Sequence, residues 1–82
     1  MTKNPFSRSI LIWRERPSNV LEIASVEQAA NFLMAGWPGE RDEWHRDALD
    51  ACLKVLDGHR STVDAEKAFR EAAHLSGILL QD

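Results

Sequence analysis

The apolar residues of this 82-residue chain change their spacing at Ser25. Before that residue, the segments 9–16 and 19–24 are rich in β-branched and aromatic side chains. They are separated by Pro17 and Ser18, and this combination predicts an antiparallel hairpin. After Ser25, apolar residues recur every three or four positions, which predicts helices. A chain of this length forms one domain, residues 1–82, with one small core that the hairpin and the helices must share.

Polar caps and glycines divide the second part of the chain into three predicted helices. The first begins after Ser25, whose hydroxyl can accept the amide of Gln28 in a capping box, and it ends at Gly36. The second spans residues 42–56, and the third follows Ser61. The residues expected to be buried are His45, Ala48, Leu49, Cys52, Leu53 and Leu56 on the second helix, and Ala65, Ala68, Phe69, Ala72 and Ala73 on the third.

A short apolar segment, residues 78–80, follows Gly77 and predicts a closing strand. The predicted order of elements is therefore β-β-α-α-α-β. This order corresponds to an α+β fold in which a small antiparallel sheet, made of the N-terminal hairpin and the short C-terminal strand, packs on three helices.

The first predicted strand is apolar on both of its sides. Ile10 and Ile12 point one way, whereas Leu11 and Trp13 point the other. Only one side of a small sheet can meet the helices, so the second apolar side needs a cover. Two covers remain open, the N-terminal segment 3–6 and a second protein chain. We favour a second chain, a homodimer partner or another protein, and the candidate interface is Leu11, Trp13 and Val20.

Three spaced motifs carry a family resemblance. They are VEQAANFLMAGWP, ALDACLKVLDG and AEKAFREAAHLSGI, and the chain from about residue 6 to residue 80 is similar to small alphaproteobacterial proteins catalogued as domain of unknown function 982. The matching residues are Ala29, Leu33, Trp37, Pro38, Ala48, Cys52, Leu56, Gly58, Ala65, Phe69, Ala72, Ala73 and Gly77. The resemblance implies no activity, because the family has none assigned, and it supplies no catalytic residues.

Residues 32–49 hold most of the side chains that could do chemistry. The Gly and Pro residues around Trp37 already punctuate the helices, which favours Trp37 as a buried anchor at the corner between the first two helices. The alternative is an exposed corner that binds a small molecule or catalyses a reaction. Its candidate residues are Trp37, Arg41, Trp44 and His45. Trp44 could equally belong to the margin of the core or to a contact surface.

A metal or nucleophile site finds little support in the sequence. His45 and Cys52 lie two helical turns apart, roughly 10 Å, which is too far for them to hold one metal ion together. Cys52 lies in the middle of a helix among leucines, where a thiol is usually a small buried apolar group. We therefore assign no catalytic, cofactor-binding or metal-binding residue.

Charge and hydropathy limit the classes of partner. Ten basic and thirteen acidic residues give a net charge of -3, which disfavours nucleic acid because phosphate binding requires a basic surface. The longest apolar run, residues 10–13, is far shorter than the ~20 residues of a membrane helix, and we see no signal peptide. The single cysteine suits a reducing compartment. The sequence thus predicts a cytoplasmic, non-enzymatic interaction or regulatory module without a cofactor.

Overall fold

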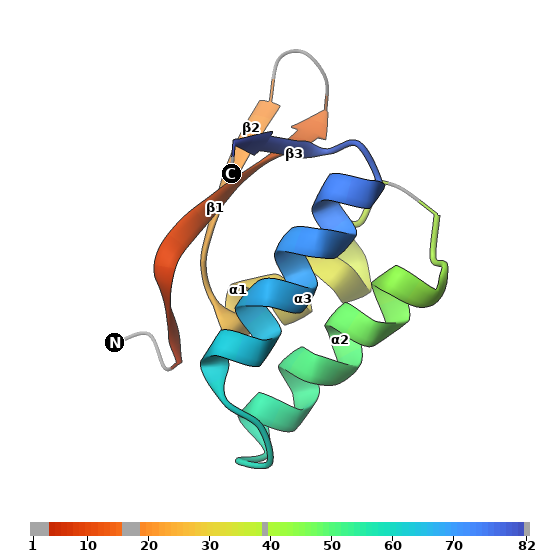
Figure 1. Ribbon diagram of the computed structural model, residues 1–82. Coiled ribbons are helices and arrows are strands. Elements are labelled where there is room, and N and C mark those ends of the chain that lie inside the picture. The colour runs from red at the N-terminus through yellow and green to blue at the C-terminus, as the bar shows by residue number, and fades with distance from the viewer. Residues whose placement is uncertain (1–3, 16–18, 39, 82) are drawn as a thin grey trace.

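The computed structural model describes residues 4–15, 19–38 and 40–81. Its elements are β1 (Pro5–Glu15), β2 (Asn19–Ser25), α1 (Val26–Ala35), α2 (Glu43–Leu56), α3 (Thr62–Leu75) and β3 (Leu79–Gln81). The helices gather on one side of a three-stranded sheet (Figure 1). The predicted order of elements and the α+β class are confirmed. No helix in the described ranges is both long and apolar enough to cross a membrane.

The sheet has the strand order β2-β1-β3, and both strand pairs are antiparallel. Ile10 pairs with Ile23 and Ile12 with Leu21, so the predicted hairpin strands do pair, although the turn at Pro17 and Ser18 lies outside the described residues. Strand β1 begins at Pro5, earlier than predicted, and its register with β2 shifts between Pro5 and Ile10. The central strand is therefore the longest, and it contacts both others.

The predicted start and end of α1 are confirmed in detail. The Ser25 hydroxyl oxygen accepts a hydrogen bond from the Gln28 amide at 3.2 Å. The Gln28 side chain reaches back as a capping box requires, but its Oε1 accepts from the amide of Ala24 at 2.8 Å. At the other end of α1, the Gly36 amide donates a hydrogen bond to the Phe32 carbonyl oxygen. These contacts fix the direction in which the chain leaves β2.

Phe69 of α3 lies at the centre of the core and is fully buried. Its ring centroid is 6.5 Å from that of Phe6, 6.3 Å from that of Phe32 and 6.1 Å from that of Trp37. The buried alanines that let the helices approach closely are Ala29, Ala30, Ala48, Ala51, Ala65, Ala72 and Ala73. Because Phe6 packs against Phe69 in this core, it is not the cover for the other side of the sheet that segment 3–6 offered as an alternative.

The predicted buried side of α2 is wrong at two positions. Leu53 and Leu56 are 42% and 41% exposed, whereas Ala51 and Val55 are buried. Helix α2 contacts both α1 and α3. Close approach to two neighbours favours small side chains. The buried arc is therefore centred near Ala48 and is rotated by roughly 60° from the leucine-rich arc that periodicity predicted. His45, Ala48 and Cys52 are buried as predicted.

Candidate functional site

The corner between α1 and α2 is filled by the ring of Trp37. This side chain is 8% exposed, and its indole N–H donates to the Glu40 carbonyl oxygen at 3.2 Å. Its ring makes edge contacts with Phe32, His45 and Phe69, with centroid separations of 5.7, 5.5 and 6.1 Å. Trp37 thus occupies the position of an anchor, which is the interpretation that the sequence favoured.

His45 lies beside Trp37 and is only 3% exposed. Its Nε2 is 2.6 Å from the Leu33 carbonyl oxygen, and a carbonyl can only accept, so Nε2 carries the hydrogen. The other ring nitrogen, Nδ1, is buried and has no hydrogen-bond partner within the described residues. Because both nitrogens point into the interior, the imidazole has no route to a substrate proton, and its contacts tie α2 to the end of α1.

The other two residues of the predicted ligand corner point elsewhere. Arg41 is exposed, and its Nη2 donates to the Met34 carbonyl oxygen at 3.0 Å. Trp44 is 38% exposed and lines a separate hollow of about 260 Å³. The remaining residues that line this hollow are Asp47, Arg60, Ala68 and Glu71. The structure therefore brings the rings of Trp37 and His45 together, whereas the side chains of Arg41 and Trp44 are exposed.

Cys52 is fully buried on α2. Removal of the thiol from water raises its pKa from the usual 9.0 to about 11, because burial disfavours the thiolate. A thiol with this pKa is neutral at physiological pH and is a poor nucleophile. Among the described residues, no three His, Cys, Asp or Glu side chains converge as a metal site would require.

The side of the sheet that faces away from the helices carries the candidate interface. We define this outer face by Leu11, Trp13, Val20, Glu22 and Leu80. Val20 is 49% exposed and Leu80 38% exposed, while Leu11 and Trp13 are half-buried. Trp13 also touches the core cluster, so only part of its ring is available at the surface. Leu80 was missed in the sequence, although its alternation with the core-packed Leu79 could have identified it.

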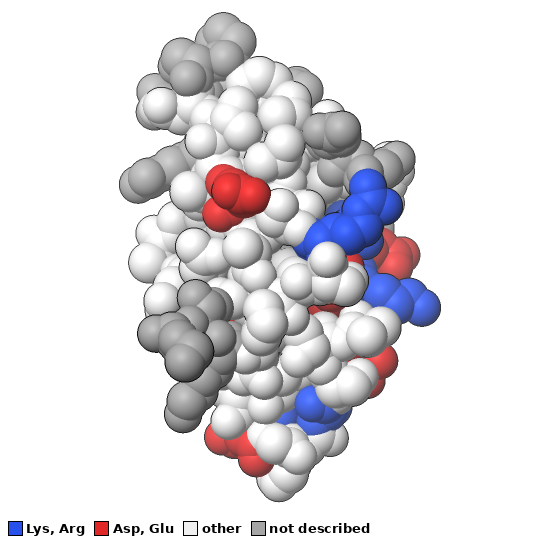
Figure 2. All heavy atoms as spheres, turned by 90° about the vertical axis from the view of Figure 1, so that its left-hand side faces the viewer, with Lys and Arg blue, Asp and Glu red and all other residues white. Residues whose placement is uncertain are grey.

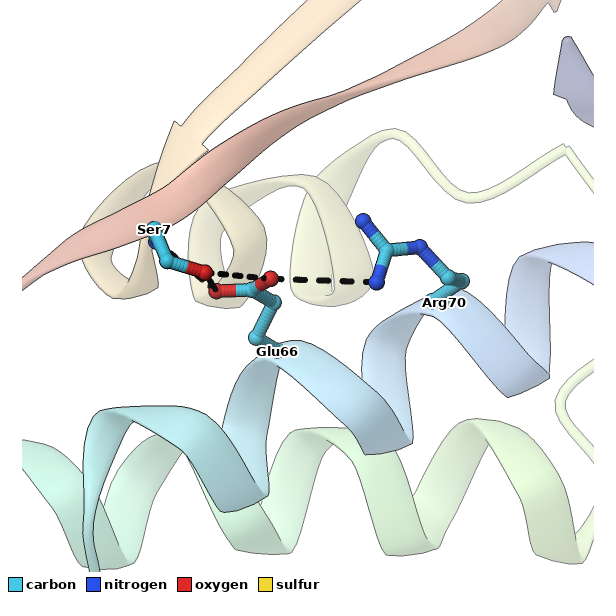
Figure 3. A network of polar contacts seen from close by, with 3 residues as sticks. All are labelled: Ser7, Glu66 and Arg70. Carbon is cyan, nitrogen blue, oxygen red and sulfur yellow. Dashed lines mark hydrogen bonds and ion pairs between the residues drawn. The ribbon is translucent and has the colours of Figure 1, made fainter. Parts of the chain in front are cut away.

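A buried carboxylate on α3 was also missed. Glu66 accepts from the Ser7 amide at 2.9 Å and from the Ser7 hydroxyl, whose Oγ is 3.0 Å from each carboxylate oxygen. Arg70 Nη1 approaches the same carboxylate at 3.7 Å (Figure 3). These contacts attach the first part of β1 to α3. The pattern that could have revealed them is a charged residue one position after Ala65 and three before Phe69, within the buried side of α3.

Comparisons with known proteins agree with this architecture. The family described as "Protein of unknown function (DUF982)" matches residues 10–80, which confirms the resemblance inferred from the three motifs. The NMR structure of the Agrobacterium tumefaciens protein Atu1219, a structural genomics target, is similar with a TM-score of 0.78 and 25% sequence identity. That match covers 99% of this chain and 80% of the other. No curated protein matches the sequence.

Proposed function

The chain belongs to the DUF982 family, and because that membership assigns no activity, we propose a function from its surface. The protein is a non-enzymatic, cytoplasmic interaction module that pairs with a second copy of itself through the outer face of its sheet. One observation carries this proposal. All three helices lie on one side of the sheet, while the other side keeps apolar residues from each of its three strands.

The outer face has the composition of a contact surface. Val20 of β2 pairs with Trp13 of β1, and Leu80 belongs to β3 on the other side of β1, so neighbouring strands contribute apolar residues to this face. On the side of the molecule on which β1 and β2 lie, most of the described surface is uncharged (Figure 2). Small soluble domains rarely keep such a patch in water without a use, because covering it removes apolar surface from solvent.

A second copy is the partner that the charges fit best. An acidic patch interrupts the upper part of this side, and most basic side chains lie toward one edge, with acidic ones among them (Figure 2). Glu22 belongs to the outer face because it pairs with Leu11 and is exposed. A twofold axis that brings the basic side chains of one copy beside this carboxylate also forms the reciprocal contact. Such reciprocal contacts close the assembly at two chains.

Light scattering after size-exclusion chromatography tests the proposal. Wild type should have close to twice the mass of one chain in the micromolar range, and Val20→Glu should be a folded monomer because it buries a charge in the patch. Val63→Glu is the matched control, since Val63 is 58% exposed on α3 and does not belong to the outer face. It should remain dimeric. A monomeric wild type, or equal masses for the two variants, would refute the proposal.

The filled corner is the reason we do not propose a small-molecule binder or an enzyme there. Trp37 and His45 occupy with their own rings the space that a ligand would need. A binding site requires a concave surface with convergent polar groups, and the polar atoms of both rings are directed at backbone carbonyls or at the interior.

A further inference from the structure

Strand β2 lies at one edge of the sheet, and a groove of about 330 Å³ runs between it and α1. On the far side of β2 from β1, no strand pairs with it among the residues that the structure describes. The residues that line the groove are Leu21, Glu22 and Ile23 of β2, Gln28, Asn31, Phe32 and Ala35 of α1, and Gly36. The α1 members recur at helical spacing and therefore form one continuous wall.

The backbone of β2 presents hydrogen-bonding groups to this groove. The Trp13 amide donates to the Ile78 carbonyl oxygen, on the β3 side of β1, so the N–H and C=O of Trp13 point away from β2. In an antiparallel pair, two residues that lie opposite each other either both direct their N–H and C=O groups toward the partner strand or both direct them away from it. Val20 pairs with Trp13, so its N–H and C=O point away from β1. Because the direction of these backbone groups alternates along a strand, the N–H and C=O of Glu22 and Ala24 also point away from β1.

The neighbouring residue Ala24 provides independent support for that direction. Its amide does donate outward, to the side chain of Gln28 at 2.8 Å, and this contact ends the open stretch of the edge. Val20 and Glu22 are left with outward-directed backbone groups along this edge, and Glu22 also lines the groove. Together they can make the hydrogen bonds of a short added strand.

The side chains of the groove define the chemistry of its occupant. Leu21, Ile23, Phe32 and Ala35 offer apolar contacts on the helix side of the added strand. Among the described residues that line the groove, the charged one is Glu22. A strand bound at this edge therefore meets negative charge, and the residue beside Glu22 is favoured when it is basic.

We propose that the groove between β2 and α1 binds an extended peptide segment of a partner protein, which adds to the sheet beside β2. Alternate residues of the segment are apolar and pack against Phe32 and Ala35, and a Lys or Arg between them lies next to Glu22. The main-chain hydrogen bonds supply affinity, and the alternating side chains supply selectivity.

The test is a display library of random extended peptides about eight residues long, selected on the full-length protein. Peptides enriched on wild type should alternate apolar residues and carry a basic one. Ala35→Trp fills the groove from an exposed position, so it should weaken binding at least about tenfold. Met34→Trp is the matched control, because Met34 is 47% exposed and does not line the groove. It should bind as wild type does.

Two further measurements identify the mode of binding. Amide hydrogen exchange of Val20 and Glu22 should slow when an enriched synthetic peptide is bound, since those N–H groups become donors to the added strand. Glu22→Gln should reduce the preference for Lys or Arg. The proposal is overturned if no peptide is enriched on wild type over Ala35→Trp. It is also overturned if the bound peptides are helical, or if exchange at Val20 and Glu22 is unchanged.

Discussion

Replacement of Trp37 by alanine tests the corner at which the sequence allowed two interpretations. The ring is 8% exposed and contacts Phe32, His45 and Phe69, so the substitution removes one member of the aromatic core and leaves a cavity between α1, α2 and α3. The Glu40 carbonyl, which accepts the indole N–H, belongs to an exposed residue and can bond water instead. Lost packing is therefore the main cost.

The magnitude follows from the size of the group. Truncation of a buried Trp costs about 3–5 kcal/mol, the sum of lost transfer free energy and the cavity that remains. A domain of this length has a total stability of about 4–12 kcal/mol. Each kcal/mol corresponds to about 4–8 °C in the melting temperature of so small a domain, so we expect Trp37→Ala to lower Tm by at least about 12 °C.

The assay is thermal unfolding followed by far-UV circular dichroism, which reports helix content without depending on tryptophan fluorescence. Trp44→Ala is the matched control. Trp44 is 38% exposed at the surface of α2, so its truncation should cost less than about 1 kcal/mol. Equal losses for the two variants, or an unchanged midpoint for Trp37→Ala, would show that the ring of Trp37 does not anchor the corner.

Three other perturbations probe the interior. Burial raises the pKa of the Cys52 thiol to about 11. The contribution of this thiol to the free energy of unfolding should therefore be complete below pH 9 and be lost as the pH rises through 11. Over that range the urea midpoint should fall less steeply for Cys52→Ala than for wild type. Glu66→Ala should cost about 1–3 kcal/mol by thermal unfolding because Ser7 loses its acceptors, whereas the exposed Glu71→Ala should change little. Ser25→Ala should cost about 1 kcal/mol in the same assay, because the α1 cap is lost.

Features that depend on neighbouring residues could be predicted from the sequence. The start of α1 depends on Ser25 and Gln28, which are three positions apart, and its end depends on Gly36. The hairpin strands were visible because alternation and a turn pair occur within one short segment. The anchor role of Trp37 followed for the same reason, since the Gly and Pro residues beside it break the helix in any tertiary context.

Features that depend on distant segments could not be predicted in this way. The buried side of α2 is set by α1 and α3 together, and their close approach favours Ala51 over the larger Leu53. The contact between Ser7 and Glu66 joins residues 59 positions apart, and neither residue has a local pattern that names the other. Hydrophobicity alone ranks Leu above Ala, so a periodicity argument selects the wrong arc whenever helices are packed through small residues.

The two proposed interfaces meet at Glu22, which makes them dependent on each other. Its side chain belongs to the outer face, where a second copy would bring basic side chains, and its backbone belongs to the edge, where a peptide strand would add. A Lys or Arg on that strand would lie beside the same carboxylate and would repel the basic edge of the second copy. Peptide binding should therefore weaken self-association. Because linkage is reciprocal, self-association should weaken peptide binding by the same factor.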